Sequence, residues 1–250
     1  MSEAKTLLLY GLHAVSATFT QAPAAVLECW LKQGAEQPEL AHLAELAQQL
    51  GVRVQHVAGT TLDRLAESTA HQGVVIRRRP PRQWGLDEWL TDTLAKTALP
   101  LALMIDQLQD PHNLGAVLRV ADAAGAHGVI LTKDRSVGVT AAVAKVASGA
   151  LDTVPIVTVT NLARAMETLK KAGLWLVGAS AEASETLYAM DLQRPLVWVI
   201  GAEGSGLRRL TRESCDLLAR IPMHGTVGSL NLSTAAAVCL FETRRQRGVH

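Results

Sequence analysis

Apolar runs of strand length alternate with amphipathic helical patterns along most of this chain of 250 residues. From residue 99 onward the runs are almost uniformly apolar, as in LPLALMID, VPIVTV and PLVWVIG. Strands that are apolar on both faces are typical of a parallel sheet covered by helices on both sides. The alternation therefore predicts an α/β fold whose larger domain, residues 99–250, contains a mostly parallel sheet.

A shorter series of the same units precedes this domain. The runs LLLYG, VLECWL, VRVQHVA and GVVIRRR alternate with helical patterns and predict a small α/β domain over residues 1–79. The segment that follows, RRRPPRQWG, contains two adjacent prolines, which break a helix or a central strand. The next run, LDEWLTDTLAK, predicts one helix, so we expect residues 80–98 to form a linker.

The charge balance gives no sign of a strongly charged partner. The sequence holds 24 Lys and Arg residues against 23 Asp and Glu residues, a formal net charge of +1. Such a chain has no global field that attracts nucleic acid or a membrane, and charge alone favours a small-molecule enzyme. The three cysteines form no closely spaced pair, and no apolar run reaches the length of a membrane span, about 20 residues. We therefore expect a cytoplasmic protein without a membrane partner.

Ligands of parallel sheets bind beyond the carboxyl ends of the strands, so a site is expected in the loops after Asp106, Gly201 and Met223. The second loop, VIGAEGSGL, has the spacing GxxGxG rather than the GxGxxG of dinucleotide-binding folds. Its Glu203 would repel a pyrophosphate, and the chain has no GxxxxGKS or GxxxxGKT phosphate loop. A dinucleotide is therefore disfavoured, although an ordinary turn between a strand and a helix explains Glu203 equally well.

Polar side chains stand out in the first and third loops. In the first, Asn113 is placed to cap a helix, with Arg119 about two turns into it. In the third, Ser229, Asn231 and Ser233 alternate with leucines ahead of a run of small residues. Helix capping accounts for one of these residues and solvation for an isolated helix arginine, but neither explains the whole set. The histidines and cysteines show no metal-ligand spacing, so we expect no metal site.

In combination, the three loops resemble a known family. In order and spacing, DPHNLGAVLR, VIGAEGSGL and IPMHGTVGSLNLSTAAAVCLFE are similar to the signature motifs of the SpoU (TrmH-like) RNA ribose 2′-O-methyltransferases of the SPOUT superfamily. The resemblance implies a C-terminal domain whose chain forms a trefoil knot that binds S-adenosylmethionine. It also implies a homodimer, and an N-terminal domain similar to ribosomal protein L30e that helps to hold RNA.

The resemblance further implies roles for particular residues, and no metal is needed because the sulfonium already activates the methyl group. The polar residues of the family's site correspond to Asn113, Arg119, Glu203, Ser229 and Asn231, and backbone contacts to the cofactor correspond to Gly201, Ile221 and Leu230. A guanidinium stays protonated at neutral pH and is a poor base. We therefore expect Arg119 to clamp a phosphate and stabilise the forming alkoxide, with Glu203 orienting Arg119 or an arginine of a partner subunit.

The basic residues are concentrated locally even though the total charge is near zero. Residues 201–250 hold seven Arg against four Asp and Glu. Arginine suits bidentate phosphate contacts and stacking on bases. We therefore expect RNA contacts from the arginines at the linker and beside the second motif: Arg77, Arg78, Arg79, Arg82, Arg208 and Arg209. A set of solvated arginines is the alternative.

Within the family, the whole chain is most similar to the bacterial enzymes that methylate a guanosine of 23S rRNA in the peptidyl-transferase P-loop. This implies ribose methylation that depends on S-adenosylmethionine and takes place during ribosome biogenesis. One open alternative is the same chemistry on tRNA or on another rRNA nucleotide, since the three motifs do not encode the target. Another is a non-catalytic RNA-binding or ribosome-assembly protein that keeps the fold, against which the intact polar residues of the motifs argue.

Overall fold

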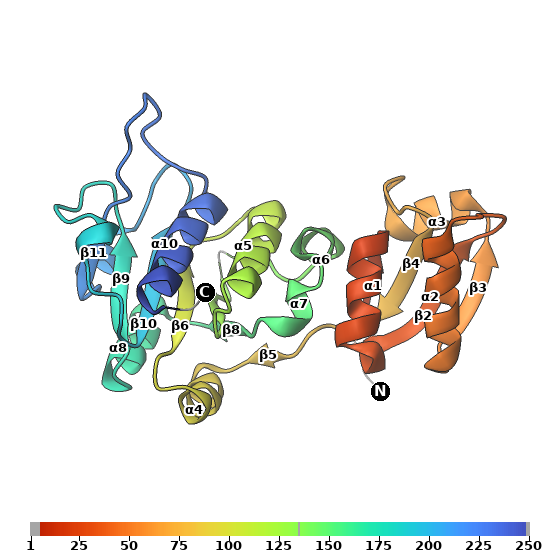
Figure 1. The fold of residues 1–250 in the computed structure, drawn as a ribbon, viewed down its shortest axis with the longest axis horizontal. Helices are drawn as coiled ribbons and strands as arrows, with labels where there is room; N and C mark the ends of the chain where they lie inside the picture. Colours follow the sequence, from red (N-terminus) through yellow and green to blue (C-terminus); the bar gives the residue numbers. More distant parts are fainter. Residues whose placement is uncertain (1–5, 135, 249–250) are drawn as a thin grey trace. The chain divides into compact units, whose positions relative to one another are not determined.

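The computed structural model describes residues 6–134 and 136–248. By their internal contacts the residues form two units, and Figure 1 shows the elements of each. The first unit contains Met1–Pro81 and Val139–Thr153, and the second contains Arg82–Gly138 and Val154–His250. The chain therefore leaves the first unit and later returns to it.

A four-stranded mixed sheet forms the centre of the first unit. Its strand order is β1-β4-β2-β3; β4 is antiparallel to β1 and β2, and β3 is parallel to β2. The strands are β1 (Leu7–Tyr10), β2 (Val26–Lys32), β3 (Arg53–Val57) and β4 (Val74–Arg78). The helices are α1 (Leu12–Gln21), the 3-10 helix η1 (Pro23–Ala25), α2 (Pro38–Gln49), α3 (Gly59–Ala66), α6 (Ala141–Ala147) and α7 (Ala150–Thr153). The small N-terminal α/β unit is thus present, with two helices added from later in the chain.

A seven-stranded sheet forms the centre of the second unit. Its order is β11-β9-β10-β6-β7-β8-β5, and every neighbouring pair in it is parallel. The strands are β5 (Gln83–Trp84), β6 (Leu101–Asp106), β7 (Val129–Thr132), β8 (Ile156–Val159), β9 (Trp175–Ala179), β10 (Leu196–Gly201) and β11 (Leu217–Ala219). The predicted α/β fold with a parallel sheet is confirmed.

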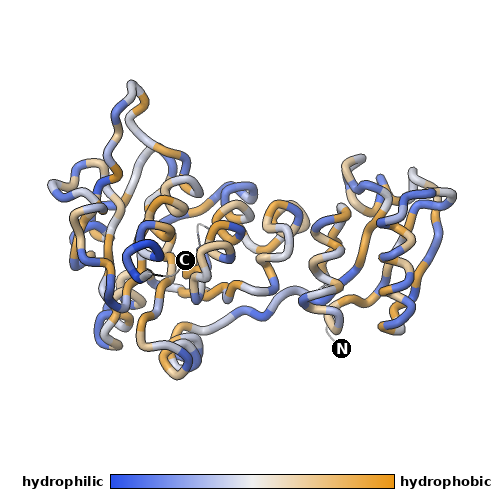
Figure 2. The backbone as a smooth tube through the Cα atoms, viewed as in Figure 1, coloured by the Kyte–Doolittle hydropathy of each residue, from blue (hydrophilic) through white to orange (hydrophobic). Residues whose placement is uncertain are grey.

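Helices cover both faces of this sheet. They are α4 (Leu86–Lys96), α5 (Pro111–Ala123), α8 (Leu162–Lys171), the 3-10 helix η2 (Leu187–Ala189), α9 (Arg209–Glu213) and α10 (Leu232–Gln246). Met104 and Val199 point to one face and share a core with α4 and α8. The Trp198 indole N–H points to the other face and donates to Thr243 of α10 at 2.9 Å. Strands β6 and β10 are buried along their length. Most of their residues are hydrophobic, as the colours of the tube in Figure 2 indicate.

The C-terminal helix is held by arginines that bind backbone carbonyls. Arg244 of α10 donates to the carbonyls of Ala124 and Gly125, just after α5. Arg247 donates to the carbonyl of Leu99 at 2.7 Å, ahead of β6. Burial lowers the pKa of Arg247 to about 10. These contacts fix α10 against the rest of the second unit.

Some segments differ from the expectation. The third loop was expected to start after Met223, but the strand that precedes it, β11, already ends at Ala219. Helix α6 lies within residues 99–250, which are expected to form the larger domain, but it belongs to the first unit. Its sequence pattern indicates a buried face and does not indicate which core this face covers. Within the expected linker, β5 joins the sheet of the second unit. Within residues 6–134 and 136–248, every helix is too short or too polar to span a lipid bilayer.

Candidate active site

The carboxyl ends of β6 and β10 bring the first two loops together. The strands are parallel neighbours, and Asp106 and Gly201 are paired at their last residues. The loop to α5 therefore starts beside the turn formed by residues 202–206. The third loop, residues 220–231, leads into α10, which packs against α5. Three segments that are far apart in sequence thus meet at one edge of the sheet.

Asp106, the last residue of β6, is a buried carboxylate with several donors. Thr211 Oγ1 donates to its Oδ2 at 2.7 Å, and Arg208 Nε donates to its Oδ1 at 2.8 Å. The backbone N–H of Arg208 adds a bond of 3.3 Å. The hydrogen bond from the guanidinium to this carboxylate raises the pKa of Arg208. Asp106 therefore fixes the segment after the glycine turn to the end of β6.

Helix α5 begins at Pro111, and its N-cap is Asp110, whose carboxylate accepts from the backbone N–H of His112 at 2.9 Å. Proline at the first helical position favours this start. The prediction that Asn113 caps the helix is therefore wrong. Asn113 lies inside the first turn, and its side chain bonds to other loops instead.

Asn113, Glu203 and Asn231 form a polar cluster that joins the three loops. The Asn113 amide donates to Glu203 Oε2 at 3.2 Å. The Asn231 amide donates to Asn113 Oδ1 at 3.0 Å and to Glu203 Oε2 at 3.4 Å. Asn231 is also the N-cap of α10, where its Oδ1 accepts from the backbone N–H of Ser233 at 2.9 Å. Direct hydrogen bonds thus bring together three residues that the motifs single out.

The expected pairing of Glu203 with Arg119 is not observed. Arg119 is exposed on α5, and within residues 6–134 and 136–248 it has no hydrogen-bond or ion-pair partner. Glu203 binds the two amides instead. Ser229 is also exposed, and its side chain makes no hydrogen bond in the described part of the chain. Both side chains are therefore available to a ligand.

The turn after β10 brings backbone close to the end of the strand. The Gly206 N–H donates to the Ala202 carbonyl at 2.9 Å, and Gly204 and Gly206 have φ angles of 81° and 64°. A Cβ on Gly201 would lie 2.0 Å from the carbonyl carbon of Gly206. A side chain at position 201 would therefore force this turn open.

A cavity of about 330 Å³ lies beside this turn. The three predicted cofactor contacts, Gly201, Ile221 and Leu230, all line it. Glu203 and Ser229 lie on its wall as well, so the cavity reaches the polar cluster. Apolar side chains and exposed glycine backbone on one wall suit a flat organic ligand with polar ring edges.

Comparison with known proteins places this site in a family. The model of the SpoU rRNA Methylase family matches residues 100–241, more than half of the chain. The chain belongs to the SpoU rRNA methylase family. A second model, described as RNA 2'-O ribose methyltransferase substrate binding, matches residues 8–84. The family resemblance predicted from the three motifs is thus confirmed.

SpoU relatives of similar length share about half of their residues with the chain. It is 50% identical over 240 residues to the 23S rRNA (guanosine-2'-O-)-methyltransferase RlmB of Shewanella oneidensis, which covers 96% of this chain and 97% of the relative. RlmB of Pseudomonas aeruginosa is also 50% identical over 240 residues, 96% of each chain. The crystal structure of the SpoU methyltransferase AviRb from Streptomyces viridochromogenes, in complex with the cofactor AdoMet, matches with a TM-score of 0.83 and 25% identity, covering 99% of this chain and 92% of that one.

Two of the arginines expected to contact RNA in this SpoU protein are bound to buried aspartates. Arg78 has 1% of its side chain exposed and pairs with Asp152. The prediction that Arg78 contacts RNA is therefore wrong, because an enclosed guanidinium cannot reach a phosphate. Arg208 remains 43% exposed but is bound to the buried carboxylate of Asp106.

The side chains of the other four expected arginines are at least partly exposed to solvent. Ion pairs exposed to solvent are worth about 0–1 kcal/mol, so a phosphate can replace the partner at little cost. RNA binding by these four arginines stays a prediction. Arg77 forms an ion pair with Glu28, Arg82 with Glu88 and Arg209 with Glu213, whereas the Arg79 guanidinium donates a hydrogen bond to the Ala24 carbonyl.

The thiols of the chain are poor nucleophiles. Burial raises the pKa of Cys29, Cys215 and Cys239 to about 12 in each case. Each is therefore a neutral thiol near pH 7. Within the described residues, no group of three or more His, Cys, Asp and Glu side chains is arranged to hold a metal ion.

Sequence reasoning assigns no role to Asp106 or Glu182, which both shape the site, and it considers Arg212 beside the second motif only as a contact to RNA. Asp106 carries a signal, because a charged residue at the end of an apolar buried strand needs a partner. Glu182 and Arg212 line the cavity as an ion pair. Glu182 carries no signal in the sequence, because its spacing relates it to none of the motifs. The pairing of Arg212 with Glu182 across 30 positions could not be predicted either.

Proposed function

We propose that this protein transfers a methyl group from S-adenosylmethionine to the ribose 2′-hydroxyl of a guanosine in 23S rRNA. The observation that best supports this proposal is sequence identity. The chain is 50% identical, over 96% of its length, to two proteins named for this activity, RlmB of Shewanella oneidensis and RlmB of Pseudomonas aeruginosa. Identity over this length includes the N-terminal part, where the choice of RNA is expected to lie. Our proposed target region is the peptidyl-transferase P-loop.

The cavity beside Gly201 fits S-adenosylmethionine. Ile221, Met223 and Leu230 offer apolar surface to an adenine, and the backbone of the glycine turn offers hydrogen bonds to its edge. Glu203 places a carboxylate on the same wall, which favours a positively charged sulfonium. AviRb, a SpoU relative of 25% identity, is known in complex with AdoMet.

The bound cofactor supplies a methyl group that its sulfonium already activates. The protein must place the 2′-hydroxyl in line with that methyl and stabilise the oxygen as its proton leaves. Arg119 suits the second task, because it is exposed, always cationic and without a partner in the described chain. It clamps the adjacent phosphate and stabilises the alkoxide, and the proton passes to that phosphate or to water.

The polar cluster orients the loops for this step. Because Asn113 and Asn231 both donate to Glu203 Oε2, the carboxylate fixes the direction of the two amides. Glu203 Oε1 accepts no hydrogen bond from the described residues and is available to a ribose hydroxyl or a water. Ser229, on the wall of the cavity, offers a hydroxyl to the same ligand.

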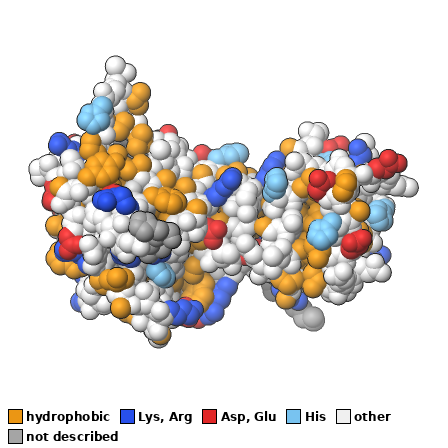
Figure 3. Space-filling model, in the orientation of Figure 1, with side chains coloured by type: hydrophobic (Ala, Val, Ile, Leu, Met, Phe, Trp, Pro, Cys, Tyr) orange, Lys and Arg blue, Asp and Glu red, His pale blue; other side chains and the backbone are white. Residues whose placement is uncertain are grey.

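We also propose the homodimer and the trefoil knot that the family resemblance implies. The segment between β11 and α10 projects from the second unit in Figure 1 and carries apolar side chains, which gather along it in Figure 3. Met223 is 38% exposed and Val227 is 65% exposed. Exposed apolar side chains of this kind support a subunit interface at this segment.

The proposed domains are an L30e-like substrate-binding domain over residues 1–79, a linker over 80–98 and the methyltransferase domain over 99–250. The match of residues 8–84 to the substrate-binding model supports the first of these. The proposed location is the cytoplasm, and the three free thiols are consistent with a reducing compartment.

A map of 2′-O-methylation across rRNA and tRNA, in cells with and without the gene, tests the proposal. We expect one guanosine of 23S rRNA to lose its methyl group, and the wild-type gene but not Arg119→Ala to restore it. A loss confined to tRNA or to another rRNA nucleotide would reassign the target. An unchanged map would contradict the enzyme assignment.

A further inference from the structure

Helices α6 and α7 come from the stretch matched by the SpoU methylase model, residues 100–241, but they pack in the first unit. Their buried residues include Val143 and Leu151. The first unit is therefore built from two stretches of chain, and residues 139–153 are one of its components.

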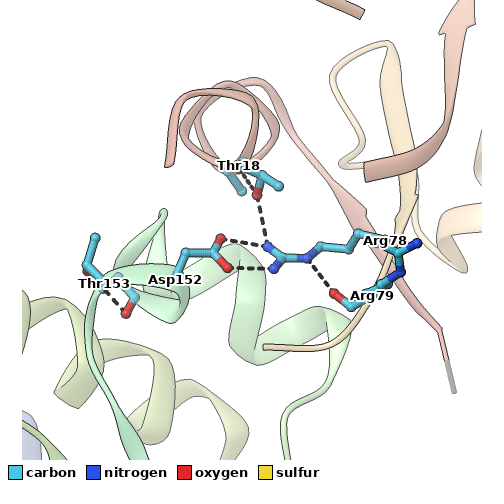
Figure 4. A network of polar contacts seen from close by, with 7 residues as sticks. Thr18, Arg78, Arg79, Asp152 and Thr153 are labelled. Carbon is cyan, nitrogen blue, oxygen red and sulfur yellow. Dashed lines mark hydrogen bonds and ion pairs between the residues drawn. The ribbon is translucent and has the colours of Figure 1, made fainter. Parts of the chain in front are cut away.

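A buried ion pair joins this stretch to the end of β4, as Figure 4 shows. The Arg78 guanidinium donates to both carboxylate oxygens of Asp152, through Nη1 at 2.6 Å and through Nη2 at 2.5 Å. Nη1 also donates to Thr18 Oγ1 at 3.2 Å, and Nε donates to the Arg79 carbonyl at 3.0 Å. The exposed fractions of the Arg78 and Asp152 side chains are 1% and 4%. Helix α1, strand β4 and helix α7 thus meet at one guanidinium.

Two further contacts hold the same stretch. Gly149 has a φ of +98° and approaches α1 so closely that a Cβ would lie 2.6 Å from the Cβ of Ala17. The Lys145 ammonium lies 4.8 Å from the centre of the Tyr10 ring and donates to the Ala70 carbonyl at 3.3 Å. The docking is therefore specific in shape as well as in charge.

The energetics of such a pair favour a role in specifying the packing. Removing one partner leaves a charge without compensation in the protein interior, whereas apolar side chains of similar size can replace both at little cost. The α6 sequence AAVAKVA offers a small apolar face that fits many partners. The bidentate ion pair between Arg78 and Asp152 determines that α6 and α7 pack in the first unit rather than against another apolar surface.

The position of this stretch also sets how often the chain connects the two units. With residues 139–153 in the first unit, the chain passes between the units at 81–82, 138–139 and 153–154. Without them, the passage at 81–82 would remain alone. A unit joined by a single connection samples more orientations than a unit joined by three. This greater freedom lowers the effective concentration, at the second unit, of a ligand that the first unit holds.

We propose that Arg78 and Asp152 are positioning residues for the RNA substrate. They keep residues 139–153 on the first unit, and the three connections then restrict where RNA held by that unit meets the methyl-transfer site of the second. The inference rests on the proposed function, which assigns RNA to the first unit. Breaking the pair therefore weakens the productive use of RNA and leaves the cofactor site unchanged.

The experiment uses the full chain and Asp152→Asn, which keeps the shape of the side chain and removes its charge. We expect amide exchange at residues 141–153 to rise by at least about tenfold, with exchange in β6 and β10 unchanged. The KM for 23S rRNA rises about tenfold, while kcat changes by less than about twofold and the affinity for S-adenosylmethionine stays constant. Asp92→Asn is the matched control, because it removes the charge of an aspartate that is paired with Lys96 at the surface of α4, outside residues 139–153, and leaves both readouts at the wild-type level.

Two further variants keep the test decisive if Asp152→Asn does not fold. Gly149→Ala disturbs the approach to Ala17 without removing a charge, and we expect it to reproduce both effects. The double variant Arg78→Met with Asp152→Leu exchanges the pair for apolar side chains, and we expect it to restore slow exchange and the wild-type KM. Faster exchange at residues 141–153 with an unchanged KM, or unchanged exchange in every variant, overturns the proposal.

The positioning role and the proposed function fail in different ways. If the wild-type protein does not methylate 23S rRNA, the proposed function fails and the positioning role falls with it, although the exchange data still report the docking. If the wild-type protein methylates 23S rRNA and the single variants share its KM, the positioning role alone is overturned.

Discussion

Each unit holds an arginine with a buried aspartate, but the surroundings of the two pairs differ. Asp152 in the first unit binds Arg78, whose side chain is 1% exposed. Asp106 in the second unit binds Arg208, whose side chain is 43% exposed, and also accepts a hydrogen bond from Thr211. One guanidinium is enclosed by protein, whereas the other still reaches water.

The difference shows how the partner and the exposure of an arginine indicate its role. The enclosed Arg78 can only hold protein elements together. Arg208 orients the segment after the glycine turn and keeps part of its surface in solvent. Arg119 has no partner among the described residues, so a phosphate can reach it without displacing a protein group. We therefore expect the three arginines to respond differently when they or their partners are replaced.

The largest effect on activity is expected from Arg119→Ala. The rate of methyl transfer falls by at least about 10²-fold, because the alkoxide and the adjacent phosphate lose their cation. Stability and the affinity for S-adenosylmethionine stay near the wild-type values, since the side chain is exposed. Single-turnover assays and calorimetric titration measure the two quantities. Arg164→Ala, on an exposed arginine of α8, is the control; turnover retained in Arg119→Ala would remove Arg119 from the mechanism.

The largest effect on stability is expected from Asp152→Asn. The first unit loses about 3–5 kcal/mol, because the enclosed Arg78 keeps its charge and loses its carboxylate. Urea unfolding followed by amide exchange in β2 and β4 measures the loss. Asp92→Asn breaks the exposed pair with Lys96 and costs less than about 0.5 kcal/mol. A loss in Asp152→Asn as small as in this control would contradict the account of the buried pair.

A smaller loss is expected from Asp106→Asn. The second unit is destabilised by about 1–3 kcal/mol, because hydrogen bonds from Thr211 and Arg208 are weakened while the Arg208 guanidinium turns to water. Amide exchange in β6 and β10 in urea measures it. A loss equal to that of Asp152→Asn would show that the exposure of the arginine does not set the cost.

The smallest effect concerns pH and is confined to the second unit. Burial, followed by the charges of Arg244 and Arg247, lowers the pKa of His127 from its ordinary value of 6.5. The unfolded chain therefore binds this proton more readily than the native chain, so the contribution is complete above pH 6.5 and is lost as the pH falls below it. The Leu101 N–H donates to Nδ1 of His127 at 3.0 Å, and protonation there removes the bond. Urea midpoints on both sides of that pH measure the slope; a slope equally steep in His127→Asn would contradict the assignment.

The fold is largely predictable from the sequence because its strongest signals are local. The apolar runs that end at Asp106 and Gly201 become β6 and β10, buried on both faces. The membership of α6 is not predictable, since a short alanine-rich helix has a buried face that fits several cores. The contact that decides it joins Asp152 to Arg78, 74 positions away in the sequence.

At the site, the sequence indicates the residues better than their partners. Asn113, Glu203 and Asn231 stand out in the motifs, and the structure joins them by hydrogen bonds. The cap of α5 was expected at Asn113, but Pro111 sets an earlier start and Asp110 takes the cap. Glu203 binds an amide 90 positions away rather than an arginine, and no spacing rule relates residues so far apart.

The most direct measurement of the central claim is methyl transfer by the purified protein to unmodified 23S rRNA. The RNA is incubated with S-adenosylmethionine carrying a labelled methyl group, digested to nucleosides and analysed by mass spectrometry. We predict label in 2′-O-methylguanosine at a single position, with none when Arg119→Ala replaces the wild-type protein. Label on a base, or no label in RNA from the wild-type protein, would contradict the account.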